Sequence, residues 1–292
     1  MALPLFFLSG CFGVHSAPTP PTDSGPPPSP GPDAGDDAGE NLCEGPLDHL
    51  DACTSRTGTT GVCVDGTCAA PRCDPTEPFG APELVGVGDT GVDVDGWLSS
   101  EELTLYFRSD RAGSASEDLY AASRTTTSGT FGAPALIPNV NSYGYENGVV
   151  LPSDGLSLYL GSTRAGAHDI YVATRAAAGD DFGAPTLLAN VNDAGANDVP
   201  TWIDADSRTL YFWTDRGTSR DMYVATRTGP TASFGAPQPI AGINDATAND
   251  WWAVLSSDGL TIYFLSDRAG GAGGADIWTA TRATFADDFS GV

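Results

Sequence analysis

The chain has 292 residues, and its 38 acidic residues against 13 basic ones give a formal net charge of −25. This length accommodates one large domain or two smaller ones. The charge argues against a nucleic-acid partner, because phosphate binding requires clustered Lys and Arg. With 36 Gly, 22 Pro and only 17% charged residues, a long helical bundle is also excluded.

The N-terminus indicates export. Residues 2–8 form an apolar run that is far shorter than the roughly 20 residues of a membrane span, and it resembles the end of a signal peptide. The next residues, Leu8-Ser9-Gly10-Cys11, resemble a bacterial lipobox, which implies lipid attachment to Cys11. The run departs from a signal peptide in having no basic residue before it, and the alternative is an apolar N-terminus with an incidental Cys. Phe12 after the Cys favours the outer membrane by the same resemblance.

Residues 12–41 are rich in Pro, Gly and Asp and have almost no apolar side chains beyond the first few. Such a segment cannot bury enough apolar surface to offset the entropy of ordering it. Pro-rich chain stays extended and acts as a semi-rigid spacer. We therefore expect a disordered tether between a lipid anchor at residues 1–11 and the folded part of the chain.

Residues 42–76 predict a small cystine-rich module, as in many exported proteins. Within it, the segment from Gly61 to Cys68 is typical of a tight, disulfide-stapled hairpin. A zinc site is the competing interpretation, but there is no Cys-x-x-Cys pair and His49 stands alone. If Cys11 carries lipid, two disulfides and one unpaired thiol are expected, with unknown pairing, among Cys43, Cys53, Cys63, Cys68 and Cys73.

Residues 77–292 contain four copies of one repeat. Leu105-Tyr-Phe-Arg-Ser-Asp-Arg111 recurs from Leu158, Leu210 and Ile262, at offsets of 158 − 105 = 53, 210 − 158 = 52 and 262 − 210 = 52. Two further motifs recur at the same pace, Asp-Ile-Tyr-Val-Ala-Thr-Arg in several variants and Phe-Gly-Ala-Pro. Motifs in constant order at one period identify a repeat architecture.

Each repeat reads as four antiparallel strands. Short apolar stretches are separated by Gly, Asp, Asn and Ser, which is the pattern of strands and turns. In the third repeat we expect an inner strand over 199–204, a second over 209–213, a third over 221–226 and an outer strand over 234–240. Pro is tolerated in that last strand because one of its edges lacks a partner. About 50 residues in four strands is the size of a propeller blade, so the sequence predicts an all-β propeller with four visible four-stranded blades.

The segments Pro152-Ser-Asp-Gly-Leu-Ser-Leu-Tyr-Leu160 and Leu255-Ser-Ser-Asp-Gly-Leu-Thr-Ile-Tyr-Phe264 resemble the WD-like repeats of TolB-type β-propellers. The resemblance covers roughly residues 79–292. It implies a propeller in the bacterial envelope that works by binding other molecules. TolB itself has six such blades and an added domain, so its own partners are not carried over.

The way the ring closes is open from sequence. The body starts with an outer-strand motif at Phe79, and Phe289 follows Arg282 by seven residues, as Phe182 follows Arg175. One expectation is a clasp in which residues 79–87 complete the fourth blade and remove an exposed edge. A truncated product and a ring completed by a dimer are the alternatives.

One carboxylate recurs twelve residues before the start of each Leu/Ile-Tyr motif. These residues occupy an equivalent place at the start of each inner strand, near one mouth of the axial channel: Asp93, Glu146, Asp198 and Asp250. Converging carboxylates would suit Ca²⁺ or another hard cation, which makes Ca²⁺ a candidate cofactor. The alternative, which the residues favour, is that each carboxylate caps its own turn between blades.

Asp and Arg residues recur around the hairpin between strands two and three, and they predict structural Arg–Asp bonds across that hairpin in place of catalysis. No catalytic constellation is recognisable. His168 is the only His of the repeats, and neither Gly-x-Ser-x-Gly nor His-Glu-x-x-His occurs. The segment from Ser256 to Ile262 is one residue short of a sialidase-type box and lacks its Trp.

Certain aromatic residues vary between repeats and are candidate ligand contacts, because an aromatic face beside a carboxylate can stack on a sugar and hydrogen-bond it. The candidates are Trp97, Tyr145, Trp251 and Trp252, with Tyr143 and Trp202 nearby. Packing between blades is the alternative for each. As neighbours in a strand, Trp251 and Trp252 should face opposite sides, so one is expected to point away from the core between blades.

Together these features predict a lipid-anchored envelope protein at the outer membrane, facing the periplasm or the cell surface. Its propeller would bind a protein or glycan without catalysis, would touch the membrane only through the lipid, and would not bind nucleic acid. The alternative is a carbohydrate-active propeller enzyme resembling a glycoside hydrolase.

Overall fold

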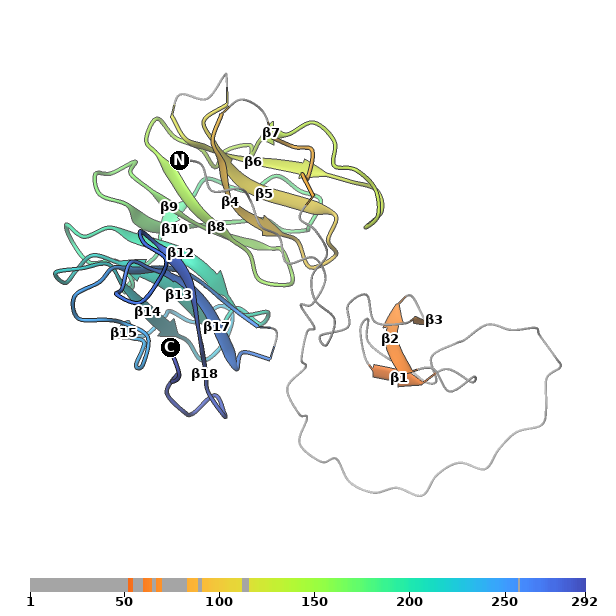
Figure 1. The fold of residues 1–292 in the computed structure, drawn as a ribbon. Coiled ribbons are helices and arrows are strands. Elements are labelled where there is room, and N and C mark those ends of the chain that lie inside the picture. Colours follow the sequence, from red (N-terminus) through yellow and green to blue (C-terminus); the bar gives the residue numbers. More distant parts are fainter. Residues whose placement is uncertain are drawn as a thin grey trace. The chain divides into compact units, whose positions relative to one another are not determined.

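The computed structural model describes residues 52–54, 60–64, 67–69, 83–88, 91–111, 116–256 and 258–292 (Figure 1). The described strands fall into two units, β1–β3 and β4–β18. The predicted lipobox with Cys11 and the predicted tether lie outside the described residues. Within the described part, no helix has the length and apolar character needed to cross a membrane.

The smaller unit is a three-stranded antiparallel sheet of β1 (Ala52–Thr54), β2 (Thr60–Val64) and β3 (Thr67–Ala69). In its β2–β3 hairpin, Cys63 lies directly opposite Cys68. The hairpin predicted for this segment is therefore confirmed. The cysteine side chains are outside the description, as are Cys43 and Cys73, so the disulfides stay a prediction.

The larger unit consists of four antiparallel sheets, each built from one repeat. The inner strands are β4 (Asp93–Leu98), β8 (Glu146–Val150), β12 (Asp198–Ile203) and β16 (Asp250–Leu255). The second strands are β5 (Thr104–Ser109), β9 (Ser157–Ser162), β13 (Thr209–Thr214) and β17 (Thr261–Ser266). The third strands are β6 (Asp118–Ser123), β10 (Asp169–Thr174), β14 (Asp221–Thr226) and β18 (Asp276–Thr281). The outer strands are β7 (Ala135–Leu136), β11 (Thr186–Leu187) and β15 (Gln238–Pro239).

The fourth blade has three described strands and only the start of an outer strand, as the incomplete last repeat of the sequence predicts. Its described sheet has the order β16-β17-β18, and the outer strand is reduced to a single bridge between Thr281 and Ser290. The all-β propeller architecture and the strand order within each blade are also as predicted. Pro239 lies in the outer strand β15, where the missing N–H faces no further strand.

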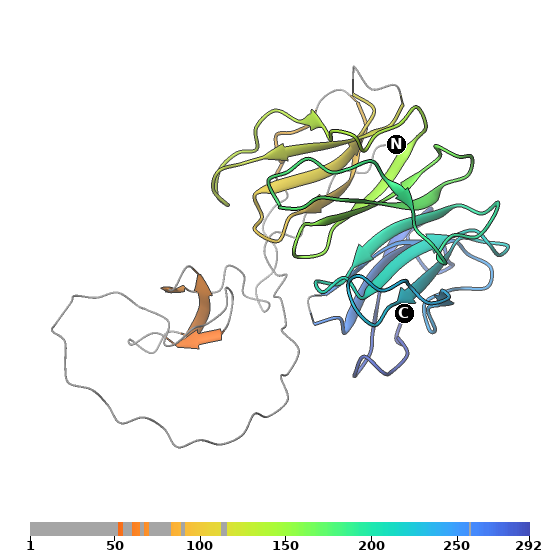
Figure 2. The same cartoon turned by 180° about the vertical axis from the view of Figure 1, so that it is seen from behind.

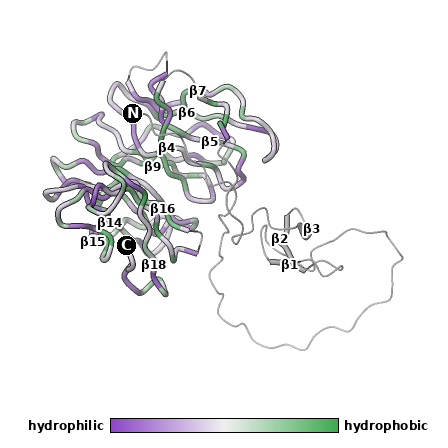
Figure 3. The backbone as a smooth tube through the Cα atoms, viewed as in Figure 1, coloured by the Kyte–Doolittle hydropathy of each residue, from purple (hydrophilic) through white to green (hydrophobic). Residues whose placement is uncertain are grey.

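The blades stack because their second and third strands are apolar on both faces. Tyr106 and Leu119 of the first blade pack with Leu158 and Leu160 of the second, and similar clusters join the second to the third and the third to the fourth. Figure 3 shows hydrophobic segments running along the strands of all four blades. Burial of both faces of a sheet accounts for the near-continuous apolar runs in these strands.

The blades follow one another in chain order, and the first and fourth lie at opposite ends of the row (Figures 1 and 2). Among the described residues of 83–88, Leu84 is 97% exposed, whereas Val85 and Val87 pack against the first blade itself. These described residues form no ladder with β18. Ser290 forms the bridge to Thr281 at the edge of that strand. Among the described residues, the expected clasp within one chain is therefore not seen, and residues 79–82 lie outside the description.

Candidate functional site

The repeated carboxylates are held by arginines of their own blades. Arg216 Nη2 lies 2.7 Å from Asp198 Oδ1, and the matching distance from Arg268 to Asp250 is 2.6 Å. The first blade repeats the pair, with 2.6 Å between Arg111 and Asp93. These contacts form because the first residue of the inner strand lies opposite the last residue of the second strand, two residues before the Arg.

Each arginine makes further structural contacts. Arg216 Nη2 also donates to the Val191 carbonyl oxygen at 3.0 Å, and its Nε donates to Thr214 Oγ1 at 3.1 Å. Its guanidinium lies 4.8 Å from the ring centroid of Tyr223, within the range of a cation–π contact. The arginine therefore ties together two strands, the preceding linker and an aromatic ring.

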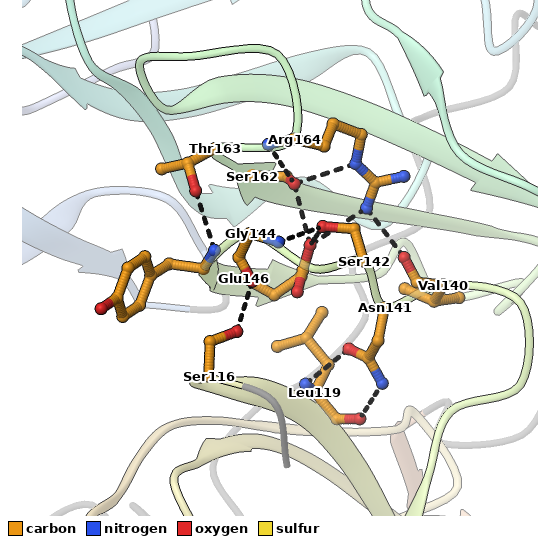
Figure 4. Close-up of polar contacts among 11 residues, drawn as sticks. Ser116, Leu119, Val140, Asn141, Ser142, Gly144, Glu146, Ser162, Thr163 and Arg164 are labelled. Carbon is orange, nitrogen blue, oxygen red and sulfur yellow. Dashed lines mark hydrogen bonds and ion pairs between the residues drawn. The ribbon is translucent and has the colours of Figure 1, made fainter.

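In the second blade Glu146 stands where the other blades have Asp. Its Oε1 accepts hydrogen bonds from Ser142 at 2.5 Å and Ser162 at 2.9 Å, and lies 3.3 Å from Arg164 Nη2 (Figure 4). Its Oε2 is buried without a hydrogen-bond partner. The additional methylene group thus keeps the ion pair at a longer distance and recruits Ser142.

The four carboxylates do not form a metal centre. Among the described residues, no group of three or more His, Cys, Asp or Glu side chains is placed to hold a metal ion. Glu146, Asp198 and Asp250 are fully buried, and each is already paired with an arginine. These residues therefore do not fit the predicted Ca²⁺ ring. Their contacts fit the alternative interpretation, in which each carboxylate holds its own blade together.

The arginines also differ from their predicted pairing across the hairpin. The observed ion pairs of Arg216 and Arg268 reach back to the inner strand, not forward to Asp221 or Asp276. Asp215, the neighbour of Arg216, accepts hydrogen bonds from the Asn197 backbone and side-chain nitrogens at 2.6 and 2.7 Å. The repeated arginines are structural, as expected, but their partners are the carboxylates of the inner strands and not those across the hairpin.

A second arginine of each repeat joins adjacent blades. Arg227 Nη2 of the third blade donates to the Tyr159 hydroxyl of the second at 2.8 Å, and Arg175 reaches Tyr106 at 3.4 Å. These arginines also lie over the Phe of the Phe-Gly-Ala-Pro motif, at 4.4 Å for Arg227 and Phe234. This motif therefore anchors the arginine that links one blade to the next.

Most of the predicted ligand-contact aromatics take part in packing. Trp97 packs against the clusters on either side of the second blade, and Trp202 meets the ring of Tyr211 edge to face at 5.5 Å. Trp251 and Trp252 both pack against the cluster between the third and fourth blades. The expectation that one of them points away is wrong, because the ladder shifts register after Trp251 and Trp252 takes a φ of 57°.

Tyr143 and Tyr145 are different, since their side chains are 99% and 54% exposed. Both lie in the linker that leads into β8, directly before Glu146. The Tyr145 backbone N–H donates to Thr163 Oγ1 of the adjacent hairpin at 2.8 Å. An exposed aromatic pair on an anchored loop is available for a ligand.

These tyrosines belong to a surface that we call the entry face. It comprises the linkers into the inner strands (141–146, 192–198 and 244–250) and the hairpins between second and third strands (163–168, 215–220 and 267–275). Backbone bonds hold the loops of neighbouring blades together, as from Asp198 N to His168 O at 2.7 Å and from Asp250 N to Arg220 O at 2.7 Å. The face is thus a continuous set of linked loops.

Sequence reasoning missed a polar cluster that does not repeat. Arg108 Nε lies 2.8 Å from Asp95 Oδ2, and its Nη1 pairs with Glu117. Burial raises the pKa of Asp95, although Arg108 and the Gly148 N–H counteract the shift. The signal in the sequence is that Arg108 replaces a Gly, Trp or Leu found at the same position of the other repeats.

Two other residues on the entry face are specific to one blade. The pKa of His168 is lowered by burial, against the opposing hydrogen bond to Asn197, so its imidazole is held neutral. Arg220 lies 5.0 Å from the ring centroid of Trp213, which stacks on Trp252. These residues give the face an asymmetry that the repeats alone would not supply.

No protein-family model matches the chain. No curated protein matches it significantly in sequence. Among solved structures, a protein of Agrobacterium tumefaciens assigned as TolB shares 17% identity at a TM-score of 0.48, with 83% of this chain and 76% of that chain covered. TolB of Acinetobacter baumannii shares 13% at a TM-score of 0.46, covering 68% of this chain and 43% of that one.

The α-L-arabinofuranosidase of Podospora anserina, solved with cellotriose, is also similar, at 14% identity and a TM-score of 0.44 over 72% of this chain and 70% of that one. At such identities the likeness concerns the fold alone. The predicted architecture is confirmed by the sheets themselves: the body of this chain is an all-β propeller built from four repeats.

Proposed function

We propose that this propeller is a non-catalytic binding module for a protein or glycan in the bacterial envelope, and that the entry face is its contact surface. The observation that carries the proposal is the exposure of Tyr143 and Tyr145 on a face whose repeated carboxylates are already occupied by arginines. Side chains that neither pack nor pair are free to contact a ligand. Tyrosine is well suited to this, because its ring stacks and its hydroxyl hydrogen-bonds.

The envelope location in this proposal rests on the N-terminal sequence. The lipobox-like Leu8-Ser9-Gly10-Cys11 and the Pro-rich segment after it suit a lipid anchor with a tether. The cysteine-rich module suits an oxidising compartment. Lipid attachment to Cys11 is part of the proposal.

The net charge of the chain restricts the class of ligand that the entry face can bind. With a formal net charge of −25, the surface disfavours an anionic partner at low salt. Asp215 and Asp267 add carboxylates to the entry face, each hydrogen-bonded to a neighbouring Asn. A neutral glycan or a basic protein segment fits these properties best.

A glycoside-hydrolase activity is the second candidate, and one observation favours it. Asp95 and Glu117 flank Arg108, and the raised pKa of Asp95 is the property a general acid needs. The Asp95 side chain is only 5% exposed, however, which restricts contact with a substrate.

The test uses the full chain on a glycan array and on a library of displayed peptides, with a parallel screen for released sugar. Binding without turnover supports the proposal, whereas released sugar that is lost in Asp95→Asn supports the hydrolase. The double variant Tyr143→Ala/Tyr145→Ala should lose binding by about tenfold or more, on the scale of interface hot spots. Phe285→Ala is the matched control, because Phe285 is 72% exposed but lies at the opposite end of the sheets. Equal loss in both variants would contradict the assignment of the entry face.

A further inference from the structure

The same Tyr–Arg hydrogen bond recurs at the junctions between consecutive blades. The Tyr of the second strand in one blade meets the Arg at the end of the third strand in the next, as in Tyr159 with Arg227 and Tyr211 with Arg282. Tyr106, Tyr159 and Tyr211 are each at most 5% exposed for this reason. The same two groups are therefore needed at any further junction of the same kind.

The first and fourth blades, at the two ends of the row, each carry one member of this Tyr–Arg pair without the other in the residues that the structure describes. Tyr263 of the fourth blade is 39% exposed, and no arginine partner for it is seen among the described residues. Arg124 of the first blade keeps its bonds to the Glu102 and Gly129 carbonyl oxygens, at 2.8 and 3.4 Å, but reaches no tyrosine in the described part of the chain. One end presents the acceptor and the other the donor of the same junction.

An apolar side chain that is buried at the other junctions is also exposed on the fourth blade. The second residue of the third strand is fully buried in the first three blades, as Leu119, Ile170 and Met222, whereas the equivalent Ile277 is 69% exposed. In those blades the carbonyl of this residue accepts a backbone bond from the outer strand, such as Ile240 N to Met222 O at 2.9 Å. In the fourth blade the bridge to Ser290 lies at the other end of β18.

The edge of β18 that no described strand covers has a candidate complement ahead of the first blade. Counted from the Phe-Gly-Ala-Pro motif, Glu83-Leu84-Val85 corresponds to Ala135-Leu136-Ile137. Gly86 comes one residue earlier after that motif than Gly242 does, and it has the same φ of 78°. Arg111 Nη2 donates to the Val87 carbonyl oxygen at 3.0 Å, as Arg164 does to Val140 at 2.8 Å. This segment is therefore seated on the first blade as if it arrived from a preceding blade.

We propose that the occupant of this junction is a second copy of the chain. Residues 83–85 of one copy add to the edge of β18 in the other, Val85 covers Ile277, and Arg124 meets Tyr263. A twofold axis repeats the junction, so the same contact forms twice and the ring closes. Two sets of four blades give eight, which is within the range of known propellers.

A second copy fits better than closure within one chain. The described strands of the first and fourth blades lie at opposite ends of the row and share no substantial packing (Figures 1 and 2). Addition of a strand to an exposed edge also removes the aggregation risk of that edge. The inference is independent of the ligand proposed above.

Sedimentation equilibrium of the full chain tests the proposal. We expect a mass twice the 30.0 kDa of one chain. Ile277→Asp should raise the dimer dissociation constant roughly 100-fold, since it places a charge in the core of both junctions. Leu187→Asp is the matched control, because Leu187 is exposed on an internal blade and should leave the mass unchanged.

A second pair of variants distinguishes a loss of dimerisation from a loss of monomer stability. Tyr263→Phe should weaken the dimer about tenfold without changing thermal stability of the monomer, since its hydroxyl has a partner only across the junction. Tyr159→Phe removes the same bond inside one chain, so it should lower stability and leave the mass unaltered. A wild-type chain that stays monomeric at micromolar concentration overturns the proposal, as does a dimer unaffected by both Ile277→Asp and Tyr263→Phe.

Discussion

The Tyr159 hydroxyl and Arg227 Nη2 lie 2.8 Å apart across the boundary between the second and third blades. Tyr159 is 1% exposed, so this hydrogen bond is made almost without water. Arg227 is in turn held over Phe234 and bonded to the Ser207 carbonyl oxygen. The pair shows how a repeat motif on one blade fixes its neighbour.

Tyr159→Phe should therefore lower the free energy of unfolding by about 1–3 kcal/mol, because a charged donor loses its buried acceptor. Urea denaturation followed by circular dichroism measures the change. Tyr143→Phe serves as the control, since that ring is 99% exposed and its hydroxyl is solvated. Equal effects of the two substitutions would show that the bond across the blades adds nothing to stability.

The ion pair between Asp198 and Arg216 predicts a larger effect. The Asp198 side chain is fully buried, and Arg216 is 17% exposed. Asp198→Ala leaves the guanidinium without its counterion and should cost about 3 kcal/mol or more in unfolding free energy. The pair of Asp206 with Arg208 at 3.0 Å has exposed fractions of 58% and 53%, so Asp206→Ala should change stability by less than about 1 kcal/mol. A comparable loss in both variants would contradict a structural role specific to the repeated carboxylates.

The sequence predicts the strands because their signals are local and repeated four times. The expected 221–226 strand coincides with β14, and the expected 209–213 strand lacks only Thr214 of β13. The partner of Asp198 was not predicted, because it depends on which ends of two strands meet in space. Register shifts are also invisible in the pattern of apolar residues. A positive φ at Asp95 and at Trp252 turns their side chains out of the alternation that a regular strand would impose.

The buried position of Asp95 predicts that the free energy of unfolding depends on pH. Burial raises the pKa of Asp95 above the 3.8 of an unperturbed carboxyl, so the folded state holds its proton to higher pH than the unfolded state does. The stability that Asp95 contributes is therefore fully present below the unfolded pKa and is lost as pH rises through the folded pKa. Relative to Asp95→Asn, which cannot titrate, the wild type should lose unfolding free energy as pH rises above about 4.

Comparison with the variant at each pH isolates Asp95 from its charged neighbours, Arg108 and Glu117, and from His168, which stays in both proteins. Asp267→Asn is the control of opposite sign. Hydrogen bonds from Asn249 lower the pKa of Asp267, so its contribution is present above the unfolded pKa and is lost only as pH falls below about 4. Urea denaturation at several pH values should then give a sloping difference for Asp95→Asn and a flat one for Asp267→Asn. A flat difference for Asp95→Asn as well would mean that Arg108 compensates the buried charge fully, and that the Asp95 proton has no part in the stability of the first two blades.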